Sequence, residues 1–567
     1  MRPSEARAGL LRRLAGFGID GVLVSLIVSL VYTPLPAQLA GLVFANDLFF
    51  HWDHFVMGPA VAWHHGMALG TDVYSQYGEG WPILLDAISP WLPLGHQNTI
   101  WLAMLYGCLH HVGLYVLLRA AVRSRPLAFG GTLAILATSL FSPLVAQHGH
   151  PTVLWQWPSL SVLRAPMDVW FFLCLLLHLR RPTATRAVAA GAIAGLGLWL
   201  ETDTGIFLVG TLAVYGASRF VAAELGSRLP RAVAPAGPTF AASLVALFGV
   251  AVTGLAIASR GTIFSEPGAF LAGWIGGVIN SSARGVGASY LTYFLRDHGA
   301  YLAPALAVLG IGLFAVCDTT VRLLQARATP ASVFSGCLGL YALGRCTLFV
   351  WRTVPIRLTL AAIPIGVLVV GALAALRRPL AARIAQATGL GPRWLEPILP
   401  TFVVLAGVSL LLASPSFRSY PNLWQLARSG PPEPGLVLFP EKTEIAGLPD
   451  ELRPVIRSIR TVIAEVRSLR SRGEPVAVLD PIKTLVYVET GAPPWRGDAS
   501  LFLNTWTRED LHALRDAVER DGPEHVIFRS VAPSRAVADS WRALRDTLEQ
   551  RYVPAHKLGV FERWDRR

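Results

Sequence analysis

The sequence predicts a polytopic α-helical membrane protein with about eleven transmembrane helices, followed by a soluble C-terminal α/β domain. Of the 567 residues, 53% are hydrophobic and only 15% are charged, whereas soluble domains carry roughly 25% charged residues. Several apolar runs reach about 18 residues, the length at which a helix crosses the hydrocarbon core of a bilayer. This composition excludes an ordinary soluble enzyme, and it also excludes a disordered chain.

Eleven apolar segments are predicted to span the membrane. The first follows Arg12 and Arg13 and is typical of a signal anchor; a cleaved signal peptide ending near residues 37–40 is the alternative. The stretch 81–94 is apolar but too short to span, so we expect an interfacial helix there. The predicted spans cover residues 15–37, 99–119, 127–146, 166–180, 186–200, 204–223, 239–258, 301–318, 331–351, 357–376 and 397–414.

The basic residues of the membrane part are unevenly distributed. No Lys or Arg occurs between Arg13 and Arg119, whereas the segments assigned to the cytoplasm hold 19 of the 26 basic residues that precede Pro415. Because positive loops stay in the cytoplasm, we expect a cytoplasmic N-terminus and an external loop 40–98. An odd number of spans then sends the C-terminal domain outside. We interpret the basic surplus as a topology signal, so no nucleic-acid partner is expected.

Residues 415–567 have the composition of a soluble domain, with 23 basic and 21 acidic residues, and residues 1–414 form the membrane domain. Strands alternating with helices predict a mostly parallel sheet. No G-x-G-x-x-G segment or P-loop is present, so nucleotide binding is not expected. All five cysteines lie in predicted spans and follow no disulfide or zinc pattern. The predicted helices are 448–472, 508–521 and about 535–550, and the predicted strands are 475–480, 484–489, 525–529 and 558–564.

The loop between the first two spans is the richest in candidate functional residues. Its segment 46–81 holds four carboxylates, Asp47, Asp53, Asp72 and Glu79. A carboxylate at a membrane boundary costs desolvation energy unless it is partnered or used. Burial also raises its pKa, which suits a general base.

Histidines gather in the same loop. His51, Asp53 and His54 are candidate ligands of a divalent cation such as Mg²⁺ or Mn²⁺, but they belong to no established metal-binding motif. The alternative is that these histidines are solvated or hydrogen-bonded. No cofactor is therefore assigned from the sequence, and a divalent cation stays open.

The spacing of several acidic, glycine and tyrosine residues in this loop forms a pattern. Asp53 precedes Gly66 by about a dozen positions, and the segment Asp72-Val-Tyr-Ser-Gln-Tyr77-Gly78 follows. With the C-terminal domain, this layout resembles the GT-C superfamily of integral-membrane glycosyltransferases, related to the protein mannosyltransferase and aminoarabinose transferase families. Members often continue Tyr-Gly-Pro-Gly, where this chain has Glu79 and Gly80 after Gly78.

The resemblance implies an inverting transfer of a sugar from a polyprenyl-phosphate donor to a hydroxyl of a glycan, lipid or protein acceptor. The reaction would take place at the outer face of a bacterial cytoplasmic membrane, in contact with membrane lipids. One carboxylate would accept the hydroxyl proton: Asp53 by its spacing to Gly66, or Asp47, which lies closer to the first span. The alternative is that either residue only caps a helix or faces water.

Four further residues are candidates for contact with substrate, and each has a structural alternative. Asp72 is also a plausible turn or cap residue, and Tyr77 is also typical of a membrane-interface anchor. Glu79 belongs to the same segment as Tyr77. Glu201 lies between two spans, where capping of the following helix is the plainer account.

Arginines outside the cytoplasmic segments are candidates for binding the donor phosphate, because a guanidinium binds phosphate through two parallel hydrogen bonds. Arg345 lies inside an apolar span, where a charge is expensive and usually functional. Arg352 and Arg357 follow it closely, and Arg164 precedes the fourth span. The alternative is that these arginines reach the interface or pair with Glu201, Asp203 or Asp297.

Two other functions stay open at this stage. A flippase or exporter of a lipid-linked sugar would also need spans, arginines and external carboxylates, although transporters often show internal repeats and none is visible here. A non-catalytic assembly protein would use the external domain to bind partners.

Overall fold

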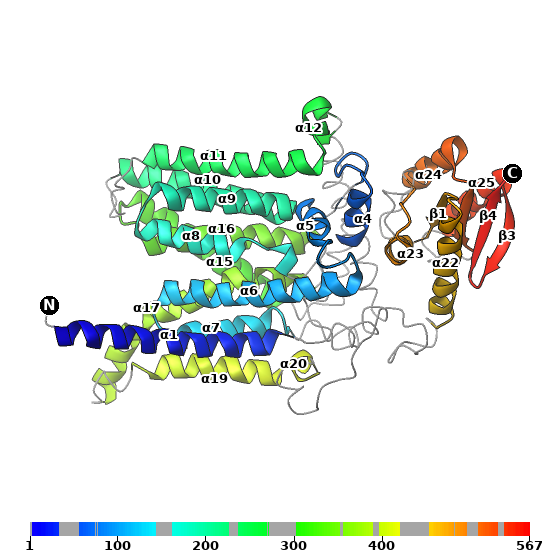
Figure 1. Cartoon of the computed structure of the whole chain (residues 1–567). Helices are drawn as coiled ribbons and strands as arrows, with labels where there is room; N and C mark the ends of the chain where they lie inside the picture. Colours follow the sequence, from blue (N-terminus) through cyan, green and yellow to red (C-terminus); the bar gives the residue numbers. More distant parts are fainter. Residues whose placement is uncertain are drawn as a thin grey trace.

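The chain folds into a bundle of roughly parallel helices with a small sheet domain beyond one end (Figure 1). The N-terminus lies at the opposite end of the bundle. We call the end that faces the sheet domain the α4 end. The computed structural model describes residues 3–32, 56–73, 75, 78–142, 162–225, 236–268, 270–271, 302–351, 355–388, 396–419, 453–480, 482–495, 508–530 and 538–567.

Each of the eleven segments predicted to span contains a helix. The predicted limits are correct to within several residues at most ends, because long apolar runs determine the helices directly. The helices of the bundle are α1 (Pro3–Val31), α6 (His96–Val122), α7 (Arg125–Thr138), α8 (Asp168–Arg180), α9 (Ala184–Leu200), α10 (Thr202–Glu224), α11 (Ala236–Ala258), α15 (Leu302–Leu324), α16 (Pro330–Trp351), α17 (Ala362–Thr388) and α19 (Ile398–Ala413).

Several of these helices have the dimensions of membrane spans. In the part of the chain that the structure describes, five are long and apolar enough to cross a bilayer: Trp101–Val122, Thr202–Glu224, Gly237–Ala258, Leu302–Leu324 and Leu358–Thr388. The stretches Ala15–Val31, Ala184–Leu200 and Ile398–Ala413 are apolar but shorter. Large apolar side chains such as Phe248 and Phe314 are exposed on the outside of the bundle. That surface fits a lipid environment.

Small residues let the helices approach closely, as is common between helices in membranes. A Cβ atom at Gly195 of α9 would lie 2.5 Å from the Leu247 carbonyl oxygen of α11. A Cβ atom at Gly130 of α7 would lie 2.7 Å from the Val404 nitrogen of α19. These two helix pairs therefore depend on glycine for their backbone contact.

Short helices cover the α4 end of the bundle. His64 at the end of α4 and Asp86 of α5 contact each other at 2.6 Å, between Nδ1 and Oδ1, and the Trp81 indole donates to the Leu163 carbonyl at 3.2 Å. The predicted interfacial helix 81–94 is shorter than expected, since α5 ends at Ile88. The short helices are α4 (Gly58–His64), α5 (Gly80–Ile88), η4 (Val162–Arg164), α12 (Thr262–Ser265), η6 (Pro355–Ala361) and α20 (Pro415–Ser419).

The C-terminal region forms a four-stranded sheet with the order β1-β2-β4-β3. Strands β1 and β2 are parallel, whereas β2–β4 and β3–β4 are antiparallel. The elements are α22 (Arg453–Ser471), β1 (Val476–Leu479), α23 (Lys483–Thr490), α24 (Arg508–Asp521), β2 (His525–Arg529), α25 (Ala538–Arg551), β3 (Tyr552–Leu558) and β4 (Phe561–Arg566).

Two expectations for this region were wrong. The segment 484–489, expected as a strand, lies in helix α23, whose Tyr487 hydroxyl accepts a hydrogen bond from the Val478 amide of β1 at 3.0 Å. A short apolar run does not distinguish a strand from one turn of buried helix. The sheet is also not mostly parallel, because strand β3, which was not predicted, turns at Gly559 with φ of +73° and pairs antiparallel with β4, where the final strand was expected.

Candidate functional site

A buried group of opposite charges lies where η4 meets the start of α10. The Arg164 Nε atom lies 3.1 Å from Oε1 of Glu201, and its Nη2 atom pairs with Asp203. The Glu201 side chain is fully buried, and the Arg164 side chain is 7% exposed. We call Arg164, Glu201 and Asp203 the Arg164 cluster.

The local sequence explains why these charges meet. Helix α9 ends at Leu200 and α10 starts at Thr202, so Glu201 is the joint between them. Its Oε2 atom accepts from the Thr204 amide at 2.9 Å and from the Thr204 hydroxyl at 2.7 Å. A carboxylate at a helix N-terminus is favoured by the helix dipole. Glu201 therefore caps α10, as the structural alternative expected, and it also pairs with Arg164.

The candidate loop segment packs directly on this joint. Gly78 has φ of +123°, and a Cβ atom added there would lie 2.7 Å from the Leu200 carbonyl oxygen and 3.0 Å from the Glu201 Cα atom. The Ser75 hydroxyl donates to the Gly78 carbonyl at 2.6 Å. Glu79 is fully buried next to this contact. Glu79 and Glu201, separated by more than 100 positions in sequence, thus belong to one region.

Arg345 of α16 joins the same region. Its Nη1 atom donates to the Arg164 carbonyl at 3.0 Å, and its Nε atom donates to the Leu360 carbonyl of η6 at 3.2 Å. Among the described side chains, no carboxylate forms an ion pair with Arg345. Arg345 therefore donates its hydrogen bonds to backbone carbonyls and lines a cavity together with Asp168, whereas Arg164 is paired directly with two carboxylates.

A small cavity of about 40 Å³ opens beside Arg345 and is lined by His110 and Asp168, among others. His110 Nε2 lies 3.4 Å from Asp168 Oδ1, and both side chains are almost fully buried. Neither residue was selected from the sequence. The available signal was a charged or titratable residue inside a predicted apolar span, which is uncommon and often functional. The same reasoning that selected Arg345 applies to both.

Other predicted residues lie elsewhere or outside the described part. Asp72 is exposed on a turn, where its Oδ2 atom accepts from the Ala68 amide at 2.8 Å. The backbone of Arg357 belongs to η6, and nothing is described of its side chain. The residues outside the described ranges are Asp47, His51, Asp53, His54, Tyr77 and Arg352.

The described chain resumes at Val56, after the segment that carries Asp47 and Asp53. Val56 and Met57 are buried, and the Thr99 hydroxyl of α6 contacts the Met57 sulfur at 2.8 Å. The loop is therefore anchored on the bundle at this point.

The structure offers no ready metal centre in its described ranges: no group of three or more His, Cys, Asp or Glu is arranged there to hold a metal ion. The candidate ligands His51 and His54 fall outside these ranges. The carboxylates of the Arg164 cluster form ion pairs with a guanidinium instead of facing a metal site.

Comparison with known proteins finds similar solved structures only. No protein-family model and no curated protein sequence matches the chain. The structure of ArnT from Cupriavidus metallidurans bound to undecaprenyl phosphate has 15% identity, 97% coverage of both chains and a TM-score of 0.47. The same ArnT in the apo state has 15% identity, covers 97% of this chain and 98% of its own, and has a TM-score of 0.45.

A third similar structure is the Archaeoglobus fulgidus oligosaccharyltransferase in complex with Zn and sulfate. It has 12% identity, covers 96% of this chain and 72% of its own, and has a TM-score of 0.45. At these identities and TM-scores, the similarities do not assign an activity to this chain.

Proposed function

We propose that this chain is a membrane glycosyltransferase that moves a sugar from a polyprenyl-phosphate donor to an acceptor hydroxyl. The observation that carries the proposal is the meeting of Arg164, Glu201 and Arg345 with the Gly78–Glu79 segment at the α4 end of an apolar bundle. Buried charges in such a bundle are costly and are typical of substrate sites. The segment that packs on Glu201 is the one that resembles GT-C enzymes.

The proposed reaction needs few groups. The acceptor oxygen forms a bond to the anomeric carbon, the bond from that carbon to the phosphate oxygen breaks, and the hydroxyl proton passes to the Asp53 carboxylate. Attack from the face opposite the phosphate inverts the configuration. The phosphate leaves without a general acid when positive charge stabilises it.

The arginines divide into two roles in this proposal. Arg345, with Arg352 and Arg357 that follow it in the sequence, stabilises the leaving phosphate. Arg164 holds Glu201 and the Gly78 segment in place, because its charge is already paired. Glu79, Glu201, Asp72 and Tyr77 are the proposed contacts on the acceptor side.

The proposed topology follows the arginine asymmetry. Eleven helices cross a bacterial cytoplasmic membrane, the N-terminus is cytoplasmic, and the α4 end and the C-terminal domain face outward. Donor and acceptor would then meet at the outer leaflet, where no nucleotide sugar is present. The acceptor is a glycan, a lipid or a protein.

The test of the base is Asp53→Asn, with Asp47→Asn as the matched comparison. Mass spectrometry of lipid-linked sugars in a deletion strain first identifies the donor that accumulates, and that lipid is then used with purified protein. A positioned base contributes typically about 10²–10⁴-fold, so transfer by Asp53→Asn should fall by that factor and more donor should not restore it. Asparagine caps a helix about as well as aspartate, so the capping alternative expects near-normal transfer.

The outcomes separate the alternatives. Loss in Asp47→Asn with full activity in Asp53→Asn would move the base to Asp47. Full transfer in both variants would exclude a single-carboxylate mechanism. If neither wild type nor variants transfer the sugar but the lipid carrier still crosses the membrane, the protein is a flippase or exporter.

Arg352→Ala and Arg357→Ala test the phosphate site. Loss of a charge-assisted hydrogen bond costs roughly 1.5–3 kcal/mol, about 10- to 100-fold in transfer rate at limiting donor. Arg322→Ala is the control, because Arg322 is exposed on α15 and pairs with Asp318 of the same helix. Wild-type donor dependence in both variants would remove these two residues from the site.

A further inference from the structure

A cavity in the described part of the C-terminal domain has a volume of about 810 Å³, within the range of small-molecule sites. Part of its wall is a run of three residues, Pro493, Pro494 and Trp495, that follows α23. The opposite parts come from the end of α22 and the end of α24. We call it the Trp495 cavity, because Trp495 is its one aromatic lining residue. The lining residues are Arg470, Gly473, Glu474, Pro475, Val476, Ala492, Pro493, Pro494, Trp495, Ala517, Arg520, Asp521 and Pro523.

The apolar side of the Trp495 cavity is rigid. Trp495 is half-buried and packs against the core cluster that includes Ala477 and Leu514, while the same side chain lines the cavity. Packing on the core fixes the orientation of the indole. The prolines beside it have a fixed φ angle, so this wall loses little entropy on binding a ligand.

The polar side carries two positive and two negative side chains, Arg470, Arg520, Glu474 and Asp521. Arg520 and Asp521 contact each other at 3.1 Å and are both largely exposed. The cavity therefore offers charged hydrogen-bonding groups of both signs and no net charge. Such a set suits a neutral, polar ligand better than a phosphate or an acidic chain.

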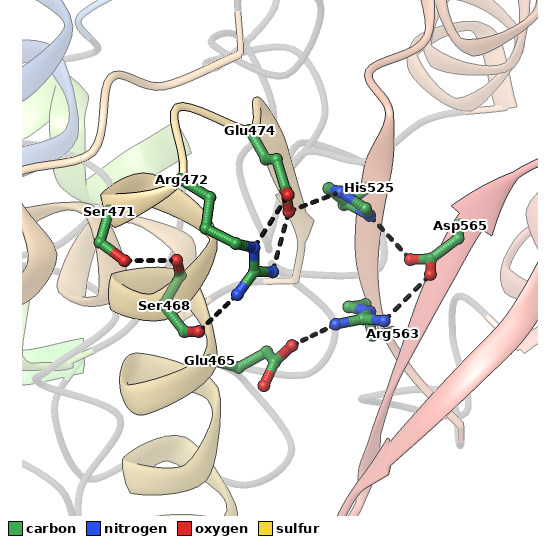
Figure 2. A network of polar contacts seen from close by, with 8 residues as sticks. All are labelled: Glu465, Ser468, Ser471, Arg472, Glu474, His525, Arg563 and Asp565. Carbon is green, nitrogen blue, oxygen red and sulfur yellow. Dashed lines mark hydrogen bonds and ion pairs between the residues drawn. The ribbon is translucent and has the colours of Figure 1, made fainter.

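Glu474 is held in position by its neighbours (Figure 2). Arg472 donates to both of its carboxylate oxygens at 2.8 Å. His525 lies 3.2 Å from Glu474 Oε2 and 2.7 Å from Asp565 Oδ1. The Arg472 hydrogen bonds hold the pKa of Glu474 below its ordinary value, so it stays an acceptor at neutral pH.

The cavity lies next to the α4 end of the bundle. Helix α23 contacts α4, and Figure 1 shows these two helices facing each other. The pKa of His65, at the end of α4, is lowered first by burial and then by the charges of His64 and Arg470. Arg470, a lining residue of the cavity, is thus within electrostatic reach of the loop that carries the candidate site.

We propose that the Trp495 cavity binds a neutral saccharide. The negative face of an indole attracts the polarised C–H groups on the apolar face of a sugar ring. Carboxylate and guanidinium groups around that ring would hydrogen-bond its hydroxyls, and bonds to charged groups are the stronger kind. The further statement that this saccharide is part of the acceptor rests on the proposed function; the binding itself does not.

The test uses full-length protein in phosphatidylcholine nanodiscs, because sugar-headed detergents would compete. An array of neutral and acidic oligosaccharides finds the probe, and calorimetric titration then gives its dissociation constant. We expect a neutral oligosaccharide to bind. Trp495→Ala should weaken binding at least about fivefold, since truncating a central aromatic anchor typically costs more than about 1 kcal/mol. Trp495→Phe keeps a ring and should lose less.

The controls separate binding from folding. Trp91→Ala removes an indole that is 82% exposed on the loop and should leave binding unchanged. The double change Arg520→Ala with Asp521→Ala alters only exposed side chains and should weaken binding even if Trp495→Ala does not fold. The proposal is wrong if wild type binds no saccharide, if it binds only a proline-rich peptide, or if both the Trp495 and the Arg520/Asp521 variants bind like wild type. Wild-type binding without any sugar transfer supports the cavity and counts only against the proposed function.

Discussion

The Arg164 cluster and the polar network around His525 are built from the same residue types in opposite surroundings. In the bundle, the Arg164 and Glu201 side chains are 7% and 0% exposed. In the C-terminal domain, Arg472 and Glu474 are 46% and 31% exposed, although Arg472 makes two hydrogen bonds of good geometry (Figure 2). Hydrogen-bond geometry alone therefore does not tell which group contributes more to stability. The difference between the two groups is how deeply their charges are buried.

The comparison shows where the removal of one charge of a pair should destabilise the protein most. An exposed pair typically contributes about 0–1 kcal/mol, because water screens it and compensates each partner. A buried pair gains little over an apolar replacement, but removing one partner costs about 3–5 kcal/mol, since the other charge is left without water. The Arg164 cluster should therefore tolerate change badly, and the His525 network should tolerate it well.

The largest effect is expected for Arg164→Met. Methionine keeps the length and the apolar stem but leaves the fully buried Glu201 and the partly buried Asp203 without their guanidinium partner, so the free energy of unfolding should fall by about 3–5 kcal/mol. Denaturant titration in detergent micelles measures it. The matched control is Arg322→Met, whose partner Asp318 lies on the same helix at 2.7 Å in a half-exposed pair; about 0.5 kcal/mol or less is expected there. Equal losses in the two variants would contradict the ranking by burial.

An intermediate effect is expected for Gly78→Ala, which breaks the contact between the loop and Glu201 without touching any charge. Alanine disfavours φ of +123°, and its Cβ atom would lie 2.7 Å from the Leu200 carbonyl oxygen. Backbone strain of this kind costs about 1–3 kcal/mol. Stability should fall by that amount, and transfer should fall with it because the loop moves away from the cluster.

Gly210→Ala is the control for this change. Gly210 lies inside α10 with nothing within 4 Å of an added Cβ atom, and alanine is the better helix former. Stability should therefore be unchanged or higher. If Gly78→Ala behaves like Gly210→Ala, the loop does not depend on this contact.

The helices of the bundle could be predicted from the sequence, whereas the contacts between distant segments could not. Apolar runs determine a helix from local sequence, which is why the spans from 99–119 to 397–414 all contain helices. Segment 484–489 failed because its apolar run is too short to show a period. Strand β3 was missed because it follows α25 directly, and the predicted strand 558–564 began only at the turn at Gly559.

In the candidate site, too, the local features could be predicted and the long-range contacts could not. Glu201 as a helix cap follows from its place before α10, and its pairing with Arg164 was foreseen only as one alternative. The contact of Gly78 with Leu200 joins positions more than 100 residues apart, and no local pattern encodes such a distance. His110 and Asp168 carry a usable signal as polar residues inside predicted spans, and that signal points to the cavity beside Arg345.

The smallest effect is expected for Glu474→Gln in the His525 network, and its sign depends on pH. The folded protein holds the pKa of Glu474 below the ordinary 4.5, mainly through the Arg472 hydrogen bonds. A lowered carboxyl pKa adds stability that is fully present above the ordinary pKa and disappears as the pH falls through the folded one. The amide variant lacks this contribution at every pH.

Hydrogen exchange of peptides covering β1 and β2 should show a small excess of protection in wild type at about pH 5.5, and this excess should vanish as the pH is lowered past the folded pKa. An excess that grows toward low pH would show that Glu474 is protonated in the native network, and the contrast with the Arg164 cluster would then rest on charge state as well as on burial.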